Sequence, residues 1–231
     1  MGQAKAIPTE YNGYWFRSRT EARWAVFFDA LGVRYEYETE GYEMSDRTKY
    51  LPDFYLPDID GGVFIEVKGQ MDEEDYHKVE MFWKEGDRPL YVLGGLPTQS
   101  DLDDDDIYGY TDKYEHCFEY SGGGRGWDWP YLFCMCPACG KVGIEFDGRG
   151  WRVCGYHDDV DMAAKTYKDK NGILRHFACP EAGFLRHEDK GYSWNQHKLV
   201  AAYKVARQAQ FDHGLTPTRQ EVRRRFAAET R

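Results

Sequence analysis

The chain has 231 residues, of which 42% are hydrophobic and 16% aromatic, enough for one sizeable domain or two small ones with a buried core. It contains no apolar run of roughly 18 residues and does not begin like a secretion signal, so we expect a cytoplasmic protein with no membrane partner. The net charge is −10, yet residues 195–231 carry eight Lys or Arg against three Asp or Glu. Overall charge therefore neither supports nor excludes a nucleic-acid partner.

The first predicted element is a helix. Ser18-Arg19-Thr20-Glu21 has the pattern of a helix start, apolar residues from Trp24 to Leu31 recur at helical spacing, and Gly32 is a typical helix end. In residues 33–38, Val and Tyr alternate with charged residues. This alternation predicts a half-exposed strand.

Three further strands and a second helix follow. Residues 53–56, bounded by prolines, and residues 63–68, preceded by a glycine-rich turn, are predicted strands. Apolar residues between Tyr76 and Trp83 predict a helix that ends at Gly86, and residues 90–93 form an apolar strand. The resulting order is αβββαβ, which predicts an α/β domain over residues 1–100.

The rest of the chain differs in composition. Residues 101–130 combine an acidic stretch with a glycine-rich segment, which indicates a connector. Residues 131–231 hold a cysteine-rich hairpin, with predicted strands at 142–146 and 151–153. A helix around 197–211 follows, and a last helix starts near Thr216 or Thr218. We expect this part to form a second, smaller region.

A carboxylate and an ammonium share one face of the strand at 63–68. Side chains at positions i and i+2 of a strand point the same way, so Glu66 and Lys68 lie together while the valines and isoleucine face apolar packing. Mg²⁺ accepts carboxylates and waters as ligands, which suits Asp53 and Glu66. Lys68 would then lie beside a scissile phosphate or its attacking water.

Glu21 has two interpretations. Ser18 and Glu21 form a capping-box pattern, in which the glutamate only satisfies the backbone at the helix start. Glu21 also precedes Trp24 and Phe28 on the face that packs on the sheet, where an unpaired carboxylate is costly. It therefore belongs to the metal site, as ligand or as support for a ligand, or caps the helix, or does both.

These residues resemble the PD-(D/E)XK nuclease superfamily, in particular its small phage-encoded members, through residues 17–25, 50–54 and 66–69. The resemblance covers roughly the first 95 residues and implies a restriction-endonuclease-like core. It also implies that Asp53 and Glu66 bind the metal, that Lys68 is the catalytic lysine and that Glu21 is the acidic residue of the helix. Gln70 lies where some members keep a polar residue near the substrate.

Two groups of arginines are candidate DNA contacts. One group flanks the first helix and the other lies on the last helix; they are Arg17, Arg19 and Arg23, and Arg223, Arg224 and Arg225. Equally, the first group could be a solvated basic face paired with nearby glutamates. His77 is expected on an exposed polar face of the second helix.

Four residues have the spacing of a structural zinc site. Cys136 and Cys139 form one knuckle, and Cys154 and His157 form the other, which closes a tetrahedral Zn²⁺ site in a zinc ribbon. Cys134 is an alternative to Cys136. Such a ribbon either contacts DNA or holds together a loop-rich region.

The sequence thus predicts an Mg²⁺- or Mn²⁺-dependent deoxyribonuclease that hydrolyses phosphodiester bonds. We expect an endonuclease of phage or host DNA processing, located in the host cell if phage-encoded, with DNA as partner and a homodimer as one assembly state. The alternative is a non-catalytic DNA-binding or protein-interaction factor on a nuclease-like scaffold.

Overall fold

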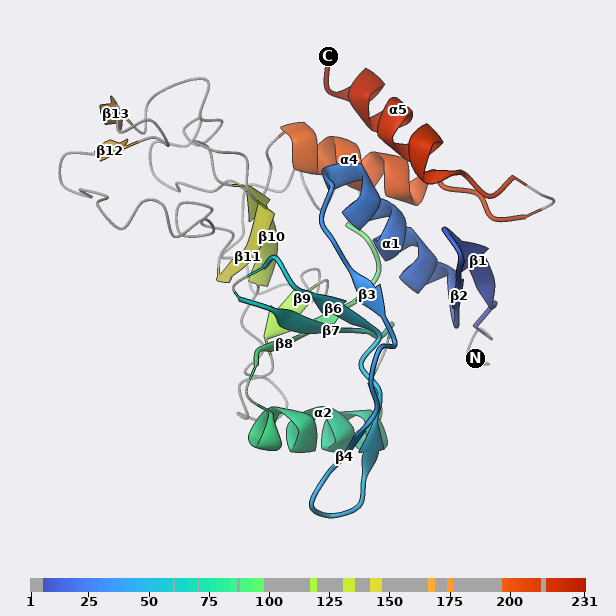
Figure 1. The fold of residues 1–231 in the computed structure, drawn as a ribbon, viewed down its shortest axis with the longest axis vertical. Helices are drawn as coiled ribbons and strands as arrows, with labels where there is room; N and C mark the ends of the chain where they lie inside the picture. Colours follow the sequence, from blue (N-terminus) through green and yellow to red (C-terminus); the bar gives the residue numbers. More distant parts are fainter. Residues whose placement is uncertain are drawn as a thin grey trace.

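The computed structural model describes residues 6–59, 61–69, 71–86, 88–97, 117–119, 131–135, 142–146, 166–168, 174–176, 197–212 and 215–231. In these residues the chain forms four helices and several small sheets, so the predicted mixed α/β class is confirmed. A central sheet lies between helix α2 on one side and a layer of three helices, α1, α4 and α5, on the other (Figure 1).

The central sheet has five strands in the order β3-β6-β7-β8-β9. Their bounds are Glu36–Tyr37 for β3, Phe54–Leu56 for β6, Val63–Val67 for β7, Leu90–Leu93 for β8 and Cys117–Glu119 for β9. Strands β7 and β8 are parallel and the other neighbours are antiparallel. Helix α2 (Glu73–Glu85) makes the crossover that a parallel pair requires.

Helix α1 (Arg19–Leu31) is buried on nearly all sides. Ser18 caps its start by accepting a hydrogen bond from the Glu21 N–H, and Gly32 ends it in the left-handed conformation at φ 73°. Its run of consecutive apolar residues suits a helix that is covered all round. The sheet covers one side of α1, and helix α4 (His197–Arg207) covers the other.

The C-terminal helices and one hairpin share the core of α1. Tyr203 of α4 stacks on Phe27 with ring centroids 4.4 Å apart, and Phe133 of β10 lies 5.2 Å from the same ring. Strand β10 (Tyr131–Met135) pairs with β11 (Val142–Phe146). The predicted boundaries of the regions remain a prediction, but the parts on either side of them contribute to one apolar cluster.

Helix α5 (Arg219–Glu229) is anchored on α1 by an ionic contact to a buried carboxylate. Asp29 of α1, with a side chain 3% exposed, accepts from Arg219 Nε at 2.7 Å. The other Asp29 oxygen accepts from the hydroxyls of Tyr11 at 2.9 Å and Tyr35 at 3.4 Å. We call these four residues the Asp29 cluster.

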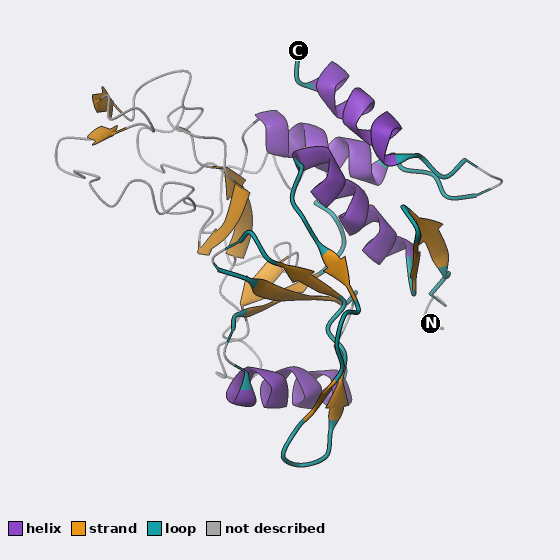
Figure 2. Ribbon diagram, viewed as in Figure 1, coloured by secondary structure: helices purple, strands orange, loops and turns teal. Residues whose placement is uncertain are grey.

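The opposite face of the sheet packs on α2. Val79 and Phe82 of that helix join Leu90 and Val92 of β8 in a second apolar cluster. Tyr50 also belongs to this cluster and comes from the hairpin of β4 (Tyr42–Glu43) and β5 (Lys49–Tyr50). Figure 2 shows this hairpin beside α2. The remaining described hairpins are β1 (Thr9–Tyr11) with β2 (Tyr14–Phe16), and β12 (Thr166–Lys168) with β13 (Leu174–His176).

Several elements differ from their sequence-based predictions. Strand β3 keeps only two residues of the predicted strand at 33–38, because the chain pairs with β6 only there. Strand β9 arises within the segment predicted as a connector and pairs with β8. Strand β11 pairs with β10, whereas its predicted hairpin partner at 151–153 lies outside the described residues. Helix α4 ends at Arg207, before the predicted end at 211. None of the described helices is long and apolar enough to cross a bilayer.

Candidate active site

Strand β7 presents Glu66 and Lys68 together, as the alternation of the strand predicts. The Glu66 residue is 4% exposed, and its Oε1 accepts from Lys68 Nζ at 3.2 Å. Val63, Ile65 and Val67 are buried in the core that contains α1. The strand therefore separates a polar side from an apolar side at Glu66.

Asp53 directly precedes β6 and lies beside Glu66. Phe54 is opposite Ile65 in the antiparallel register, so one step further along the ladder Asp53 is opposite Glu66. Asp53 is 5% exposed, and its Oδ2 accepts from the Val67 N–H at 2.7 Å. Among the described residues, no other donor contacts the Asp53 carboxylate, so its Oδ1 is available to a further partner.

Glu21 both caps α1 and belongs to the same polar region. It is 5% exposed and accepts from Ser18 Oγ at 2.6 Å, from Tyr37 OH at 2.7 Å and from the Arg17 N–H at 3.0 Å. Its negative charge also contributes to the raised pKa of Asp53, which places the two carboxylates within electrostatic range. Both oxygens of Glu21 are engaged by donors, so this geometry suits support of the site better than direct metal binding.

The carboxylates of the site lie in a strongly negative, buried environment. Burial, followed by the charges of Glu66 and Glu21, raises the pKa of Asp53 well above its usual range. Burial also raises the pKa of Glu66, although Lys68 and Tyr50 oppose this shift. Burial alone would lower the pKa of Lys68, but Glu66 and Asp75 outweigh it and the net shift is upward. A further cation would favour the ionised form of both acids.

Two residues join the site that the sequence did not single out. Asp75, in the first turn of α2, accepts from Lys68 Nζ at 3.0 Å. Tyr50 of β5 donates to Glu66 Oε2 at 2.8 Å. The capping-box pattern of Asp72 and Asp75 marks the start of α2 in the sequence, and Tyr50 precedes Asp53 by three residues, but neither signal predicts contact with β7.

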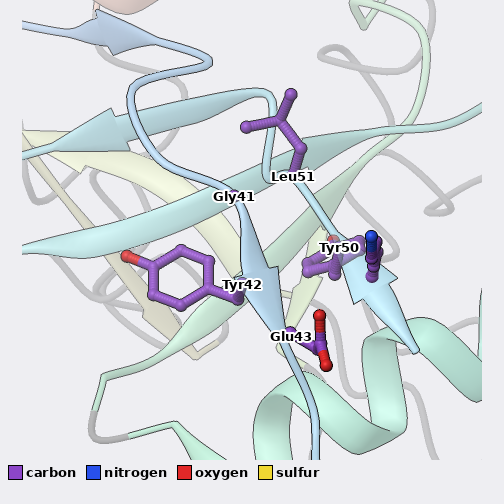
Figure 3. A pocket seen from close by; sticks show the side chains of 6 residues that line it. Gly41, Tyr42, Glu43, Tyr50 and Leu51 are labelled. Carbon is purple, nitrogen blue, oxygen red and sulfur yellow. The ribbon is translucent and has the colours of Figure 1, made fainter. Parts of the chain in front are cut away.

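A hollow adjoins the site at the β4–β5 hairpin. Its volume is about 350 Å³, and it is lined by Gly41, Tyr42, Glu43, Lys49, Tyr50 and Leu51. Figure 3 shows Tyr42 and Tyr50 on the two neighbouring strands of this hairpin. Since Tyr50 also donates to Glu66, the hollow and the carboxylates share a wall.

The candidate DNA-contacting arginines fall into two sets. Arg17 pairs with Glu38 at 2.5 Å, and Arg19 pairs with Asp212, so both have acidic partners within the chain. Arg23 is partly buried on α1. In contrast, the arginines at 223–225 are exposed on α5. His77 is exposed as expected, with Nε2 2.8 Å from Asp46 Oδ2.

The described residues contain two neighbouring carboxylates rather than a larger metal-binding group. Within the part of the chain that the structure describes, no three His, Cys, Asp or Glu side chains are placed to hold a metal ion. The predicted zinc ligands Cys136, Cys139, Cys154 and His157 lie outside the described residues, as does Gln70. Cys134 is buried in β10, where its Sγ donates to the Gly143 carbonyl at 3.7 Å.

Comparison with known proteins gives no match: no family model, no curated protein and no solved structure is significantly similar to this chain. A functional assignment therefore depends on the geometry of the site itself.

Proposed function

We propose that this protein is a divalent-metal-dependent phosphodiesterase that cuts DNA. The observation that carries the proposal is an imbalance of charge. Glu21, Asp53 and Glu66 are all buried; Asp53 lies within electrostatic range of Glu21 and of Glu66, and Asp75 lies within range of Glu66. Lys68 is the cation that contacts this group among the described residues. Such a concentration of buried acids is costly unless it serves to bind a further cation.

The arrangement of elements supports a restriction-endonuclease-like core. Helix α1, strands β3, β6 and β7, helix α2 and strand β8 follow one another in the order αβββαβ, with the short hairpin β4–β5 inserted after β3. Asp53 directly precedes β6 and Glu66 lies on the adjacent strand β7 of the same sheet, with α1 on one side and α2 on the other (Figure 1). The resemblance of the motif to PD-(D/E)XK nucleases agrees with this placement.

The donor set fits Mg²⁺ or Mn²⁺. Mg²⁺ is commonly held by one or two carboxylates, with waters and substrate phosphate completing its coordination. Asp53 and Glu66 supply two carboxylates, so the absence of a third ligand among the described residues does not conflict with this role. The bound ion would neutralise charge on the scissile phosphate and acidify a water.

The remaining site residues would orient these groups. Lys68 would place its ammonium beside the phosphate and stabilise the negative charge that grows as the phosphorus becomes pentacoordinate. Tyr50 would fix one oxygen of Glu66 by its hydrogen bond, and the Val67 N–H would fix one oxygen of Asp53. Glu21 would hold the start of α1 against the site through Ser18 and Tyr37.

The substrate and the C-terminal region complete the proposal. The exposed arginines Arg223, Arg224 and Arg225 are candidates for contacts with DNA phosphates. The zinc ribbon predicted from Cys136 to His157 would have a structural role, because four protein ligands leave no open position for substrate.

The proposal is tested by incubating plasmid and branched DNA with the full chain. We expect cutting with Mg²⁺ or Mn²⁺, none with EDTA, and a loss of about a thousandfold or more in Asp53→Asn, because the metal would lose the negative charge of one of its two carboxylate ligands. A matched control is Asp29→Asn, which removes a different buried carboxylate from the same core and should preserve cutting. Cutting that survives EDTA or Asp53→Asn would refute the proposal. Salt-sensitive DNA binding without cutting would instead favour a non-catalytic factor.

A further inference from the structure

Lys68 contacts two carboxylates that belong to different elements of the fold. Its Nζ lies 3.2 Å from Glu66 Oε1 and 3.0 Å from Asp75 Oδ1, so one ammonium bridges β7 and the start of α2. Glu66 is a predicted metal ligand, whereas Asp75 lies outside the proposed pair of ligands. The two contacts therefore have different consequences when a metal ion arrives.

Asp75 is fixed in place by the start of its helix. Its N–H donates to Asp72 Oδ1 at 2.9 Å, and its Oδ2 accepts from the Asp72 N–H at 3.4 Å. This reciprocal capping box limits the freedom of the Asp75 side chain. Oδ1, which accepts from Lys68, is thus presented from a rigid helix terminus.

A divalent ion and the Lys68 ammonium compete for the same oxygen. Glu66 Oε2 already accepts from Tyr50 OH at 2.8 Å, so Oε1 is the oxygen that faces Lys68. A metal ion that binds Oε1 must displace or share this contact with another cation, and two adjacent cations repel. Asp75 provides the ammonium with a second acceptor when Glu66 Oε1 binds the metal ion.

We infer that Asp75 is a positioning residue, which retains the Lys68 ammonium beside the site and so leaves Glu66 Oε1 available to the metal ion. This inference rests on the proposed function, because it assigns Asp75 a role in the same metal-dependent site. It differs from a role as metal ligand, because Asp75 acts through Lys68. It also differs from a purely structural role in α2, because the cap can persist without the negative charge.

The test is a double-mutant cycle on Mn²⁺ binding, measured by calorimetric titration of the full chain without DNA. The variants are Asp75→Asn, Lys68→Met and the combination. Asparagine keeps the oxygen that the capping box needs but removes the charge that holds Lys68. We expect Asp75→Asn to weaken Mn²⁺ binding by about tenfold, and Lys68→Met to tighten it, since a competing cation is removed. In the Lys68→Met background, Asp75→Asn should change affinity by less than about threefold.

A matched control is Glu74→Gln, which removes the same charge from the same helical turn. Glu74 is 74% exposed and pairs with Lys78 rather than with Lys68, so its effect on Mn²⁺ affinity should be below about twofold. The inference would be overturned if Asp75→Asn weakened Mn²⁺ binding equally in the wild type and in Lys68→Met. Asp75 would then act on the metal ion without Lys68, either as a ligand or through its negative charge. An effect of Glu74→Gln as large as that of Asp75→Asn would overturn it as well.

A second measurement separates this inference from the proposed function. The same four proteins are unfolded with urea in the absence of metal, and a non-additive effect is expected, since Asp75 and Lys68 contact each other directly. If the wild type binds no Mn²⁺ but the unfolding cycle is non-additive, the proposed function fails while the Asp75–Lys68 pair stands. If Mn²⁺ binds and the unfolding cycle is additive, the inference fails while the proposed function stands.

Discussion

The Asp29 cluster and a group of buried acidic residues lie at opposite ends of helix α1, and the two groups differ in how their negative charge is compensated. At the end of the helix, Asp29 meets one arginine and two tyrosine hydroxyls. At its start, Asp53 lies within electrostatic range of Glu21 and of Glu66, and Lys68 with its two carboxylate contacts is the nearby cation. The first group is balanced in charge, whereas the second has an excess of negative charge.

This difference indicates which group is structural. A buried carboxylate with its own cation and hydrogen bonds needs nothing further, and removal of that cation is expected to reduce stability. A buried group with more acids than cations is destabilising in isolation and becomes favourable when a cation binds. Burial alone, which both groups share, does not identify the functional site.

The first prediction sharpens the comparison through metal binding. At a Mn²⁺ concentration a hundredfold above its dissociation constant, the free energy of unfolding should rise by about 2.7 kcal/mol, because the ion binds the folded state. Thermal unfolding followed by circular dichroism, with and without Mn²⁺, measures this effect. Glu66→Gln should remove most of the increase, whereas Asp29→Asn should leave it unchanged. An increase of the same size in Glu66→Gln would place the metal elsewhere.

The second prediction concerns a variant that disrupts the Asp29 cluster. Arg219→Ala should lower the free energy of unfolding by about 2 kcal/mol, because Asp29 would remain buried without its cation. This value is below that of a fully buried pair, since the Arg219 side chain is 45% exposed. Urea unfolding of the full chain provides the measurement. Arg224→Ala, an exposed arginine of the same helix, should have little effect, and Asp29→Asn combined with Arg219→Ala should recover part of the loss.

The third prediction concerns the pH dependence of stability, and its expected effect is the smallest of the three. Burial raises the pKa of Asp29, although Tyr11 and Arg219 oppose the shift. An acid with a raised pKa binds its proton more tightly in the folded state, so its stabilising contribution is present below the unfolded value of about 3.9 and is lost as pH rises through the folded value. Asp29→Asn should therefore flatten the pH dependence of urea unfolding above pH ~4. An unchanged slope in this variant would contradict the assignment.

The two tyrosines of the Asp29 cluster stay protonated across the pH range of this unfolding experiment. Burial, together with the charge of Asp29, raises the pKa of Tyr35 to about 12 and shifts that of Tyr11 upward as well. Both hydroxyls can therefore donate to Asp29 throughout the pH window of the experiment. The change in slope can then be assigned to the carboxylate.

Local sequence patterns predicted the elements that carry the proposed metal ligands. The caps at Ser18 and Gly32 bound α1, and the alternation around Glu66 predicted its shared face with Lys68, because both signals depend on residues close together in the chain. The contacts of Asp75 with Lys68 and of Arg219 with Asp29 join elements that the sequence alone does not orient. Strand β9 was missed for the same reason, since its pairing with β8 is a long-range contact.

The position of α4 in the chain has a consequence for folding during synthesis. Tyr203 and its neighbours cover the aromatic side of α1 that includes Phe27, about 175 residues earlier in the chain. On the ribosome, that side of α1 stays exposed to water until α4 has been synthesised and has emerged. The nascent chain is therefore expected to need chaperone protection, and an N-terminal fragment should be prone to aggregation even though it carries both proposed Mg²⁺ or Mn²⁺ ligands.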